Sequence, residues 1–481
     1  MQKLRLTSFA LAGVGALLLG ACDLDVPDLN NPGLDELLQN NPTPDAINAA
    51  CTGLLIGNRR NHSAEFGYID ILGILGRENY NFDTADPRFV GELLGGNLNK
   101  GSPFGGGFWA GPYANLRLAN VTLHAVDKIN VELLPTENKQ AIRGYIHTIM
   151  ALDLLEVIAT HDTNGAVIDT DRDVNGPLGA IVDKAATYTE IKRLLDAAVP
   201  ELTAGGKTFT FLLSSGFTGF DTPTAATDAT GMKIPGRPGF LSFNRAIKAR
   251  VSAYTGNYAD VLTALGDSFI DDGPTADFDF GVYYAYSAKT NDVTNGLLNP
   301  NIFVHPSIET GAAKNTAGKV DDRFTRKVAA VEDPDDAGSA PGSSMGVTLM
   351  SSLQFTLYPD PDSRVPLIRN EELILLEAEA LFFTGQTVLA NTKLNIVRQG
   401  SGKLDPAPVT VDPAVFTSQL LYERQYSLLF EGHRWIDMRR LNRVTDMPLD
   451  DPAFKRNVRF PIPLAECNAR PSEPACSLGS T

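Results

Sequence analysis

The chain has little tryptophan, cysteine and histidine, and it has no excess of positive charge. Its 481 residues include 2 Trp, 4 Cys and 6 His, and 57 acidic side chains against 41 Lys and Arg give a formal net charge of −16. A nucleic-acid-binding protein needs a basic surface, so this charge balance argues against nucleic-acid partners. No CxxC pair occurs and the histidines show no metal-ligand spacing, so we expect neither a metal nor a cofactor.

Long apolar runs are also scarce. The run over residues 6–19 is too short to span a bilayer, because a helix needs about 20 residues to do so. The most apolar later stretch, residues 373–383, is interrupted by Glu377 and Glu379. We therefore predict that no segment of this chain crosses a membrane.

The amino terminus is typical of an exported lipoprotein. Lys3 and Arg5 precede the apolar run, which leads to the sequence Leu-Gly-Ala-Cys22. A positive start, an apolar segment and small residues before the cleavage point are the marks of an export signal. We predict a signal peptide over residues 1–21 and a diacylglyceryl group on Cys22, whose acyl chains anchor the body to a membrane. The alternative is an ordinary secretory signal in which Cys22 stands by chance.

The other cysteines have simpler roles. Cys467 and Cys476 lie in a proline-containing tail and could close a small ring in an oxidising compartment, although the sequence leaves that pairing open. Cys51 follows two alanines, so we expect it to pack as a small buried apolar residue.

Apolar residues recur at helical spacing along much of the chain. The stripes lie in residues 113–123, 142–152, 191–198, 247–265, 373–397 and 422–430. Pro200 is expected to end the third helix, whereas Gly256 and Gly385 turn two helical hairpins. A hairpin leaves an apolar face bare unless another hairpin stacks on it. The pattern predicts an all-α dominated fold: a tetratricopeptide-like superhelix of helical hairpins, with long irregular loops and at most a few short strands.

Three stretches lack helical periodicity and are rich in Gly, Asn, Asp and Thr. They cover about residues 61–112, 203–241 and 268–350. No Pro/Gly/Ser linker divides the chain, so residues 22–481 are predicted to form a single domain with these stretches as inserted loops. Binding groups concentrate on loops held by a rigid scaffold, so we expect the ligand surface there.

Several segments, in chain order, resemble the SusD/RagB family of surface nutrient-binding lipoproteins. The early segment Trp109-Ala-Gly-Pro-Tyr113 is similar to a helix of that family that carries a Trp and a Tyr. The strongest similarities are Arg369-Asn-Glu-Glu372, Ala378-Glu379-Ala380 and Asn395-Ile-Val-Arg398, then Glu423-Arg424, Phe430-Glu431-Gly432-His433-Arg434-Trp435-Ile-Asp437 and Phe460-Pro-Ile-Pro463. The resemblance implies that residues 22–481 form one SusD-like domain.

The charged residues of this motif are expected to be structural, because an arginine fork suits a carboxylate. The structural set is Arg369, Glu372, Glu379, Arg398, Glu423, Arg424, Glu431, Arg434, Trp435 and Asp437. A catalytic role for Glu431 and His433 as acid and base is disfavoured, since His433 has no nucleophile or metal signature beside it.

The resemblance also implies a function. Members of the family are not enzymes; they sit on the outer membrane and present oligosaccharides, or sometimes peptides, to a TonB-dependent transporter of the SusC type. Aromatic side chains can stack on the C–H faces of a sugar. The candidate ligand-binding residues are Tyr80, Phe82, Trp109, Tyr283, Tyr284 and Tyr286. If residues 283–286 are extended, Tyr284 points away from its neighbours, and Trp109 also fits a role in anchoring a loop to the core.

Other functions stay open at this point. Glycan-binding relatives usually use tryptophan platforms, and this chain has only Trp109 and Trp435, so a ligand other than a starch-like glycan is open. A helical-repeat scaffold lipoprotein for protein assembly would share the fold and the lipid. A glycoside hydrolase is the less favoured alternative, because it needs two carboxylates about 5–10 Å apart across a cleft and no catalytic motif accompanies the acids here.

Overall fold

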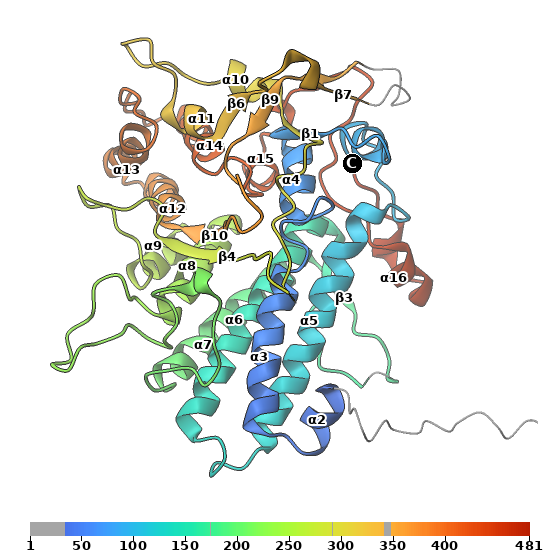
Figure 1. Cartoon of the computed structure of the whole chain (residues 1–481), viewed down its shortest axis with the longest axis vertical. Coiled ribbons are helices and arrows are strands. Elements are labelled where there is room, and N and C mark those ends of the chain that lie inside the picture. The colour runs from blue at the N-terminus through green and yellow to red at the C-terminus, as the bar shows by residue number, and fades with distance from the viewer. Residues whose placement is uncertain (1–33, 174, 291, 341–347) are drawn as a thin grey trace, which may run out of the picture.

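Helices dominate the computed structural model, which describes residues 34–173, 175–290, 292–340 and 348–481 (Figure 1). The predicted signal peptide and Cys22 lie outside these residues. Within them, no helix is both long and apolar enough to cross a membrane. The predicted fold class, a helix-dominated tetratricopeptide-like scaffold with short strands, is confirmed.

The described residues form α-helices and short 3-10 or π turns. The α-helices are α2 (Leu34–Asn40), α3 (Pro44–Arg59), α4 (Tyr68–Gly76), α5 (Pro103–Lys128), α6 (Thr136–His161), α7 (Lys184–Thr203), α8 (Phe240–Tyr254), α9 (Tyr258–Gly266), α10 (Pro306–Thr310), α11 (Asp322–Lys327), α12 (Asn370–Phe383), α13 (Thr387–Gly400), α14 (Pro413–Ser427), α15 (Arg434–Arg440) and α16 (Leu464–Ala469). Short 3-10 or π turns are η1 (Phe89–Leu94), η2 (Asp162–Asn164), η3 (Ser215–Phe217), η4 (Pro334–Asp336), η5 (Val444–Asp446) and η6 (Pro474–Ser477).

Helices that follow one another in the chain pack side by side. α5 contacts α6, α6 contacts α7, α7 contacts α8 and α8 contacts α9, after which α9 contacts α12 and α12 contacts α13. Figure 1 shows α3, α5, α6 and α7 together in the lower half of the molecule, with α12, α13 and α14 at the upper left. Each hairpin thus buries the face that its neighbour leaves bare.

Local sequence explains where several of these helices begin. The Thr43 hydroxyl accepts a hydrogen bond from the Ala46 amide at 3.2 Å and so caps α3. The Asp412 carboxylate caps α14 in the same way by accepting from the Ala414 amide at 2.7 Å. In both cases proline occupies the first helical position, where its missing N–H removes no hydrogen bond.

α12 is the central helix of the carboxyl-terminal half. Its buried side chains divide between two hydrophobic clusters: Leu373, Leu376 and Ala380 join the large core, whereas Ile374, Leu375 and Ala378 join a second cluster. The second cluster also contains residues of α13 and α14. α12 is therefore buried on nearly all sides, as expected for a helix enclosed by others.

Short strands connect distant parts of the chain. The antiparallel pairs among the described residues are β1 (Asn79–Asn81) with β5 (Ile302–Val304), β2 (Ala166–Val167) with β3 (Ile181–Val182), β4 (Gly281–Tyr284) with β10 (Val365–Arg369), β6 (Val328–Ala330) with β9 (Leu353–Phe355), and β7 (Gly338–Ser339) with β8 (Met350–Ser351). The β2–β3 pair closes residues 168–173 and 175–180 into a loop between α6 and α7, called the 168–180 loop below.

The structure differs from the sequence predictions in several places. Pro200 does not end α7; it lies inside that helix, whose last turn continues to Thr203. Residues 61–112 are not wholly irregular, because they contain α4, η1 and the start of α5. Residues 268–350 are not wholly irregular either, because they contain α10, α11 and strands β4 to β7. Nearly every residue of α4 is buried, so the helix has no polar face and shows no amphipathic period in the sequence. Cys51 is fully buried within α3, as predicted.

Candidate functional site

A groove of about 440 Å³ runs beside the amino-terminal half of α5. α5 contributes Gly106, Trp109 and Tyr113, which share one face because they are three and four residues apart. The second wall is the loop of residues 168–180, and the third is α16 with the Arg470 that follows it. Three segments far apart in the sequence therefore form one concave surface.

Two aromatic side chains form the floor of the groove. The ring centroids of Trp109 and Tyr113 are 4.9 Å apart. The Tyr113 hydroxyl donates to the Val167 carbonyl at 3.1 Å and accepts from the Val167 amide at 2.5 Å, which ties α5 to strand β2. Burial raises the pKa of the Tyr113 hydroxyl above its ordinary value, so it stays protonated. The floor is rigid and uncharged.

The walls of the groove carry paired charges. Arg172 and Asp169 form an ion pair at 2.7 Å, and the Arg172 guanidinium also donates to the Pro177 carbonyl at 2.8 Å. Arg470 forms an ion pair with Glu466 and donates to the Gly179 carbonyl at 2.6 Å. The second arginine thus links α16 to the loop of residues 168–180 across the groove.

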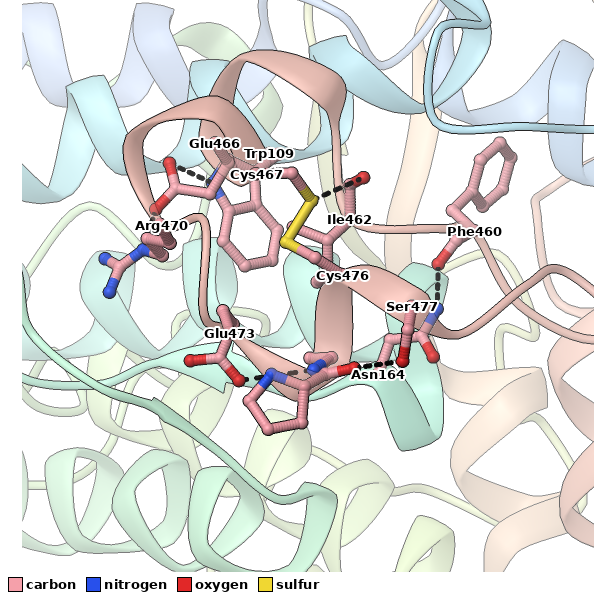
Figure 2. Close-up of a disulfide and its surroundings, with 12 residues drawn as sticks. Trp109, Asn164, Phe460, Ile462, Glu466, Cys467, Arg470, Glu473, Cys476 and Ser477 are labelled. Carbon is pink, nitrogen blue, oxygen red and sulfur yellow. Dashed lines mark hydrogen bonds and ion pairs between the residues drawn. A yellow bond between two sulfur atoms is a disulfide. The ribbon is translucent and has the colours of Figure 1, made fainter.

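A disulfide holds the α16 wall in place. Cys467 and Cys476 are bonded, and Figure 2 shows this bridge beside Trp109, Glu466 and Arg470. The Trp109 indole N–H donates to the Glu466 carboxylate at 3.3 Å, so α16 is tied to α5 next to the bridge. A ring this small contributes about 2–3 kcal/mol of stability on the chain-entropy account.

Glycine leaves space in the groove at one position of α5. A Cβ atom added at Gly106 would meet no other atom within 4 Å. At Gly179, by contrast, there is no space for a side chain, because a Cβ there would lie 2.6 Å from the Asp169 carbonyl oxygen. Gly106 keeps the groove open, and Gly179 allows the loop to fold tightly.

The predicted ligand-binding aromatics are mostly buried elsewhere. Tyr80 is 3% exposed and its hydroxyl donates to Asp450 at 2.9 Å, while Phe82 is 4% exposed. Tyr284 is buried and its hydroxyl donates to Asn58 at 2.6 Å. These rings lie in the core. β1 and β4 pair with strands from distant parts of the chain, and other residues cover the strand face on which these rings lie.

The remaining candidates divide between core and surface. Tyr286 is also buried, with the Arg59 guanidinium 5.3 Å from its ring centroid. Tyr283 points away from Tyr284, as the extended segment predicts, and is only half-buried. Trp109 alone among the candidates lines the groove. The groove residues of the 168–180 loop and of α16 were not predicted, although the Asp, Asn and Gly content of residues 162–179 is a signal for a long surface loop.

The charged residues of the late motif form a largely buried ion-pair network. Its pairs join Arg369 to Glu431 at 2.8 Å, Arg440 to Glu379 at 2.8 Å, Arg398 to Glu423 at 2.7 Å and Arg424 to Asp437 at 2.7 Å. Arg250 of α8 holds Glu372 at 2.7 Å. Burial opposes the charged form of Glu372, but Arg250 and His433 outweigh it and lower the pKa of this carboxyl to about 2.

The same motif also ties helices to backbone groups. Arg434 donates to the Leu421 carbonyl at 3.1 Å, and the Trp435 indole donates to the Asn457 carbonyl at 2.8 Å. These contacts join α15 to α14 and to the chain after α15. The motif therefore lies in the packing between helices rather than in the groove.

His433 borders a separate internal cavity of about 60 Å³. Burial lowers the pKa of His433 to about 4 and that of His62, on the same cavity, to about 3. Glu156 also lines it, and burial raises the pKa of that carboxyl well above its ordinary value. Neutral His433, His62 and Glu156 therefore share this cavity with Arg250 and Glu431, which belong to the ion-pair network. Within the described residues, no group of three His, Cys, Asp or Glu could hold a metal ion.

Comparison with known proteins matches both the late motif and the whole fold. The sequence pattern of the SusD family matches residues 361–471, which run from β10 through the ion-pair network to α16. A SusD superfamily protein from Bacteroides vulgatus superposes with a TM-score of 0.64 at 14% identity, over 89% of this chain and 97% of that one. The carboxyl-terminal part of the chain thus matches the SusD family, and the fold is that of SusD-like proteins. The predicted resemblance to this family is confirmed.

Other SusD-like structures have the same fold. A SusD-like carbohydrate-binding protein from Bacteroides fragilis has a TM-score of 0.64 at 16% identity, over 90% of this chain and 99% of that one. A laminarin-binding SusD-like protein has a TM-score of 0.58 at 15% identity, over 89% and 98%. No curated protein sequence matches this chain. At these identities the likeness establishes the SusD fold.

Proposed function

We propose that the protein is a cell-surface lipoprotein that captures an oligosaccharide or a similar solute and delivers it to a TonB-dependent, SusC-like outer-membrane transporter. The observation that carries this proposal is the SusD-family pattern over residues 361–471 on a chain whose whole described fold is SusD-like. The carbohydrate-binding and laminarin-binding names of two structural neighbours support a glycan as the ligand.

The groove supports capture rather than chemistry. Its Asp169 and Glu466 carboxylates both lie in ion pairs with arginine. A glycosidase needs two carboxyl groups that flank the bond to be cleaved, one of which donates a proton to the leaving group. The protein is therefore proposed to bind its ligand without catalysing a reaction.

The lipid anchor on Cys22 is tested by changing that residue alone. The Cys22→Ala variant is expected to leave the membrane fraction, and intact-mass measurement is expected to find acyl chains on the wild-type mature protein only. The matched control is Cys51→Ala, which alters a buried cysteine in α3 and is expected to stay in the membrane fraction. Unacylated, freely secreted wild-type protein would remove the anchor from the proposal.

The partner is tested by co-purification from outer membranes dissolved in detergent. A large β-barrel receptor is expected to elute with the wild-type protein in stoichiometric amount, and added glycan is expected to bind to the pair. Co-purification of soluble proteins without any barrel, together with no binding of glycans or peptides, would favour a scaffold for protein assembly instead.

A further inference from the structure

The charges that line the groove cancel one another. Three arginines and three carboxylates line it: Arg117, Arg172, Arg470, Asp169, Asp173 and Glu466. Two of the arginines are already paired with carboxylates of the lining. An anionic ligand would have to draw an arginine from its partner and would then face the carboxylate left behind, which is unfavourable. The charge pattern therefore discriminates against acidic ligands.

The same pattern suits hydroxyl groups. A hydroxyl can donate a hydrogen bond to a carboxylate while it accepts one from a guanidinium. The Asp169–Arg172 pair has side chains that are 53% and 39% exposed, so both partners can still reach a ligand. A molecule with neighbouring hydroxyls can bridge such a pair without separating it. The walls therefore favour a neutral, hydroxyl-rich ligand.

Most of the rest of the lining is apolar. Trp109 and Tyr113 form the floor, and the loop adds Pro177 and Leu178. Leu178 is 54% exposed, so its side chain is accessible to a ligand in the groove. A sugar ring offers C–H faces that pack on aromatic and aliphatic side chains. The volume of the groove also falls in the range of small-molecule sites, about 300–1,000 Å³.

We infer that this groove is the binding site for an uncharged oligosaccharide and that it rejects acidic glycans. The inference rests on the proposed function, because it names the ligand class of that function. Its basis is the juxtaposition of an apolar floor, charge-balanced walls and the open space that Gly106 leaves on α5.

The first test fills the groove. Phenylalanine in place of Gly106 enters open space and occupies the position of the ligand, whereas Gly91→Phe is the matched control because a Cβ at Gly91 also meets nothing and Gly91 does not line the groove. Binding of laminarihexaose and of hexagalacturonate is measured by calorimetry with the full mature lipoprotein in a detergent without a sugar headgroup. The expected result is that laminarihexaose binds wild type and Gly91→Phe equally, and Gly106→Phe at least about tenfold more weakly.

The second test changes the charge balance. The double variant Asp169→Asn with Asp173→Asn gives the lining a net positive charge, so it is expected to bind hexagalacturonate at least about tenfold more tightly than wild type does. An unchanged affinity for hexagalacturonate would overturn the charge argument.

The outcomes separate the two levels of the proposal. Tighter binding of hexagalacturonate than of neutral glycans by wild type overturns the inference and leaves the proposed function intact. If the wild-type protein binds neutral glycans and Gly106→Phe does not weaken that binding, the assignment of the site to this groove is overturned. If neither class of glycan binds, in a panel that includes several neutral hexasaccharides, glycan capture itself fails and the inference falls with it.

Discussion

Two buried polar regions of the protein shift the pKa values of their carboxyl groups in opposite directions. In the amino-terminal half, Asp153 of α6 accepts hydrogen bonds from the side-chain amides of Asn58 at 2.7 Å and Asn115 at 2.8 Å. In the carboxyl-terminal half, Glu372 of α12 is held by the Arg250 guanidinium and lies near His433. Both carboxyls are almost completely buried.

The partners decide the protonation state. For Asp153, burial is the largest influence and raises the pKa to about 7, because two neutral amides compensate only in part. For Glu372, burial also opposes the charge, but Arg250 and His433 outweigh it and bring the pKa to about 2. Equal burial thus gives a mostly neutral carboxyl in one region and a carboxylate in the other. A buried acid cannot be assigned a charge from burial alone.

The largest expected effect comes from removing Arg250, the cation that pairs with the buried Glu372 in the carboxyl-terminal half. Arg250→Met leaves Glu372 buried without its fork, so we expect the free energy of unfolding to fall by about 3–5 kcal/mol in denaturant titration. The matched control is Arg193→Met, whose side chain is 60% exposed and pairs with Glu190 on the surface of α7; it should lose about 0–1 kcal/mol.

A second substitution sharpens this test. The double variant Arg250→Met with Glu372→Met is expected to recover most of the loss, because no unpaired charge remains. If Arg250→Met costs no more than the surface control, the charged region does not depend on its ion pairs.

A smaller effect is expected from removing a partner in the neutral region. Asn58→Ala takes one amide donor from Asp153 and the acceptor of the Tyr284 hydroxyl, so stability should fall by about 1–3 kcal/mol. The loss is smaller than for Arg250→Met because Asp153 can stay protonated. The exposed Asn97→Ala serves as control and should change stability by less than about 0.5 kcal/mol. If Asn58→Ala lowered stability more than Arg250→Met does, the neutral region would depend more on its hydrogen bonds than the charged region does on its ion pairs.

The smallest expected effect is a difference in pH dependence. The pKa of Asp153 is raised from 3.8 to about 7, so its contribution is fully present below the lower value and is lost as pH rises through the upper one. The slope cannot exceed about 1.4 kcal/mol per pH unit. Glu371 and Glu372 have pKa values lowered from 4.5 to about 2, so their pH dependence has the opposite sign. Their contribution to stability is present above pH 4.5 and is lost as pH falls towards 2.

Asp153→Asn isolates the first of these slopes. The unfolding free energy of wild type minus that of this variant should decrease from pH 5.5 to pH 7.5. Over that range only the wild-type protein releases the Asp153 proton when it unfolds. Denaturant titration at both pH values measures it. A difference that does not change with pH would show that Asp153 is charged in the folded protein throughout.

The helical scaffold was largely predictable because its signals are local. The stripes that predicted helices over residues 142–152, 247–265 and 373–397 lie in α6, in the α8–α9 hairpin and in α12–α13. A period of 3.6 residues needs only one segment to be recognised. Where the local signal is missing or misleading, prediction failed. α4 is buried on nearly all sides and shows no amphipathic period, and α7 continues past Pro200 for one short turn.

The candidate site was much less predictable. All five aromatics Trp109, Tyr80, Phe82, Tyr284 and Tyr286 are buried, and Trp109 differs from the others only in that it lines the groove with the 4% of its surface that is exposed. An aromatic residue in a loop has the same appearance in the sequence whether it faces solvent or core. Strand pairing with partners more than 80 residues away, as for β4 with β10, decides between the two.

The amino-acid order alone determined which segments form helices, which faces of those helices are apolar and which residues supply the charges of the family motif. Only the tertiary structure decided which charges become partners, which aromatics are covered, and that α5, the 168–180 loop and α16 meet around one groove. The physical reason is range: helix formation depends on neighbours within about four residues, whereas burial and electrostatic pairing depend on groups that the chain brings together across hundreds of residues.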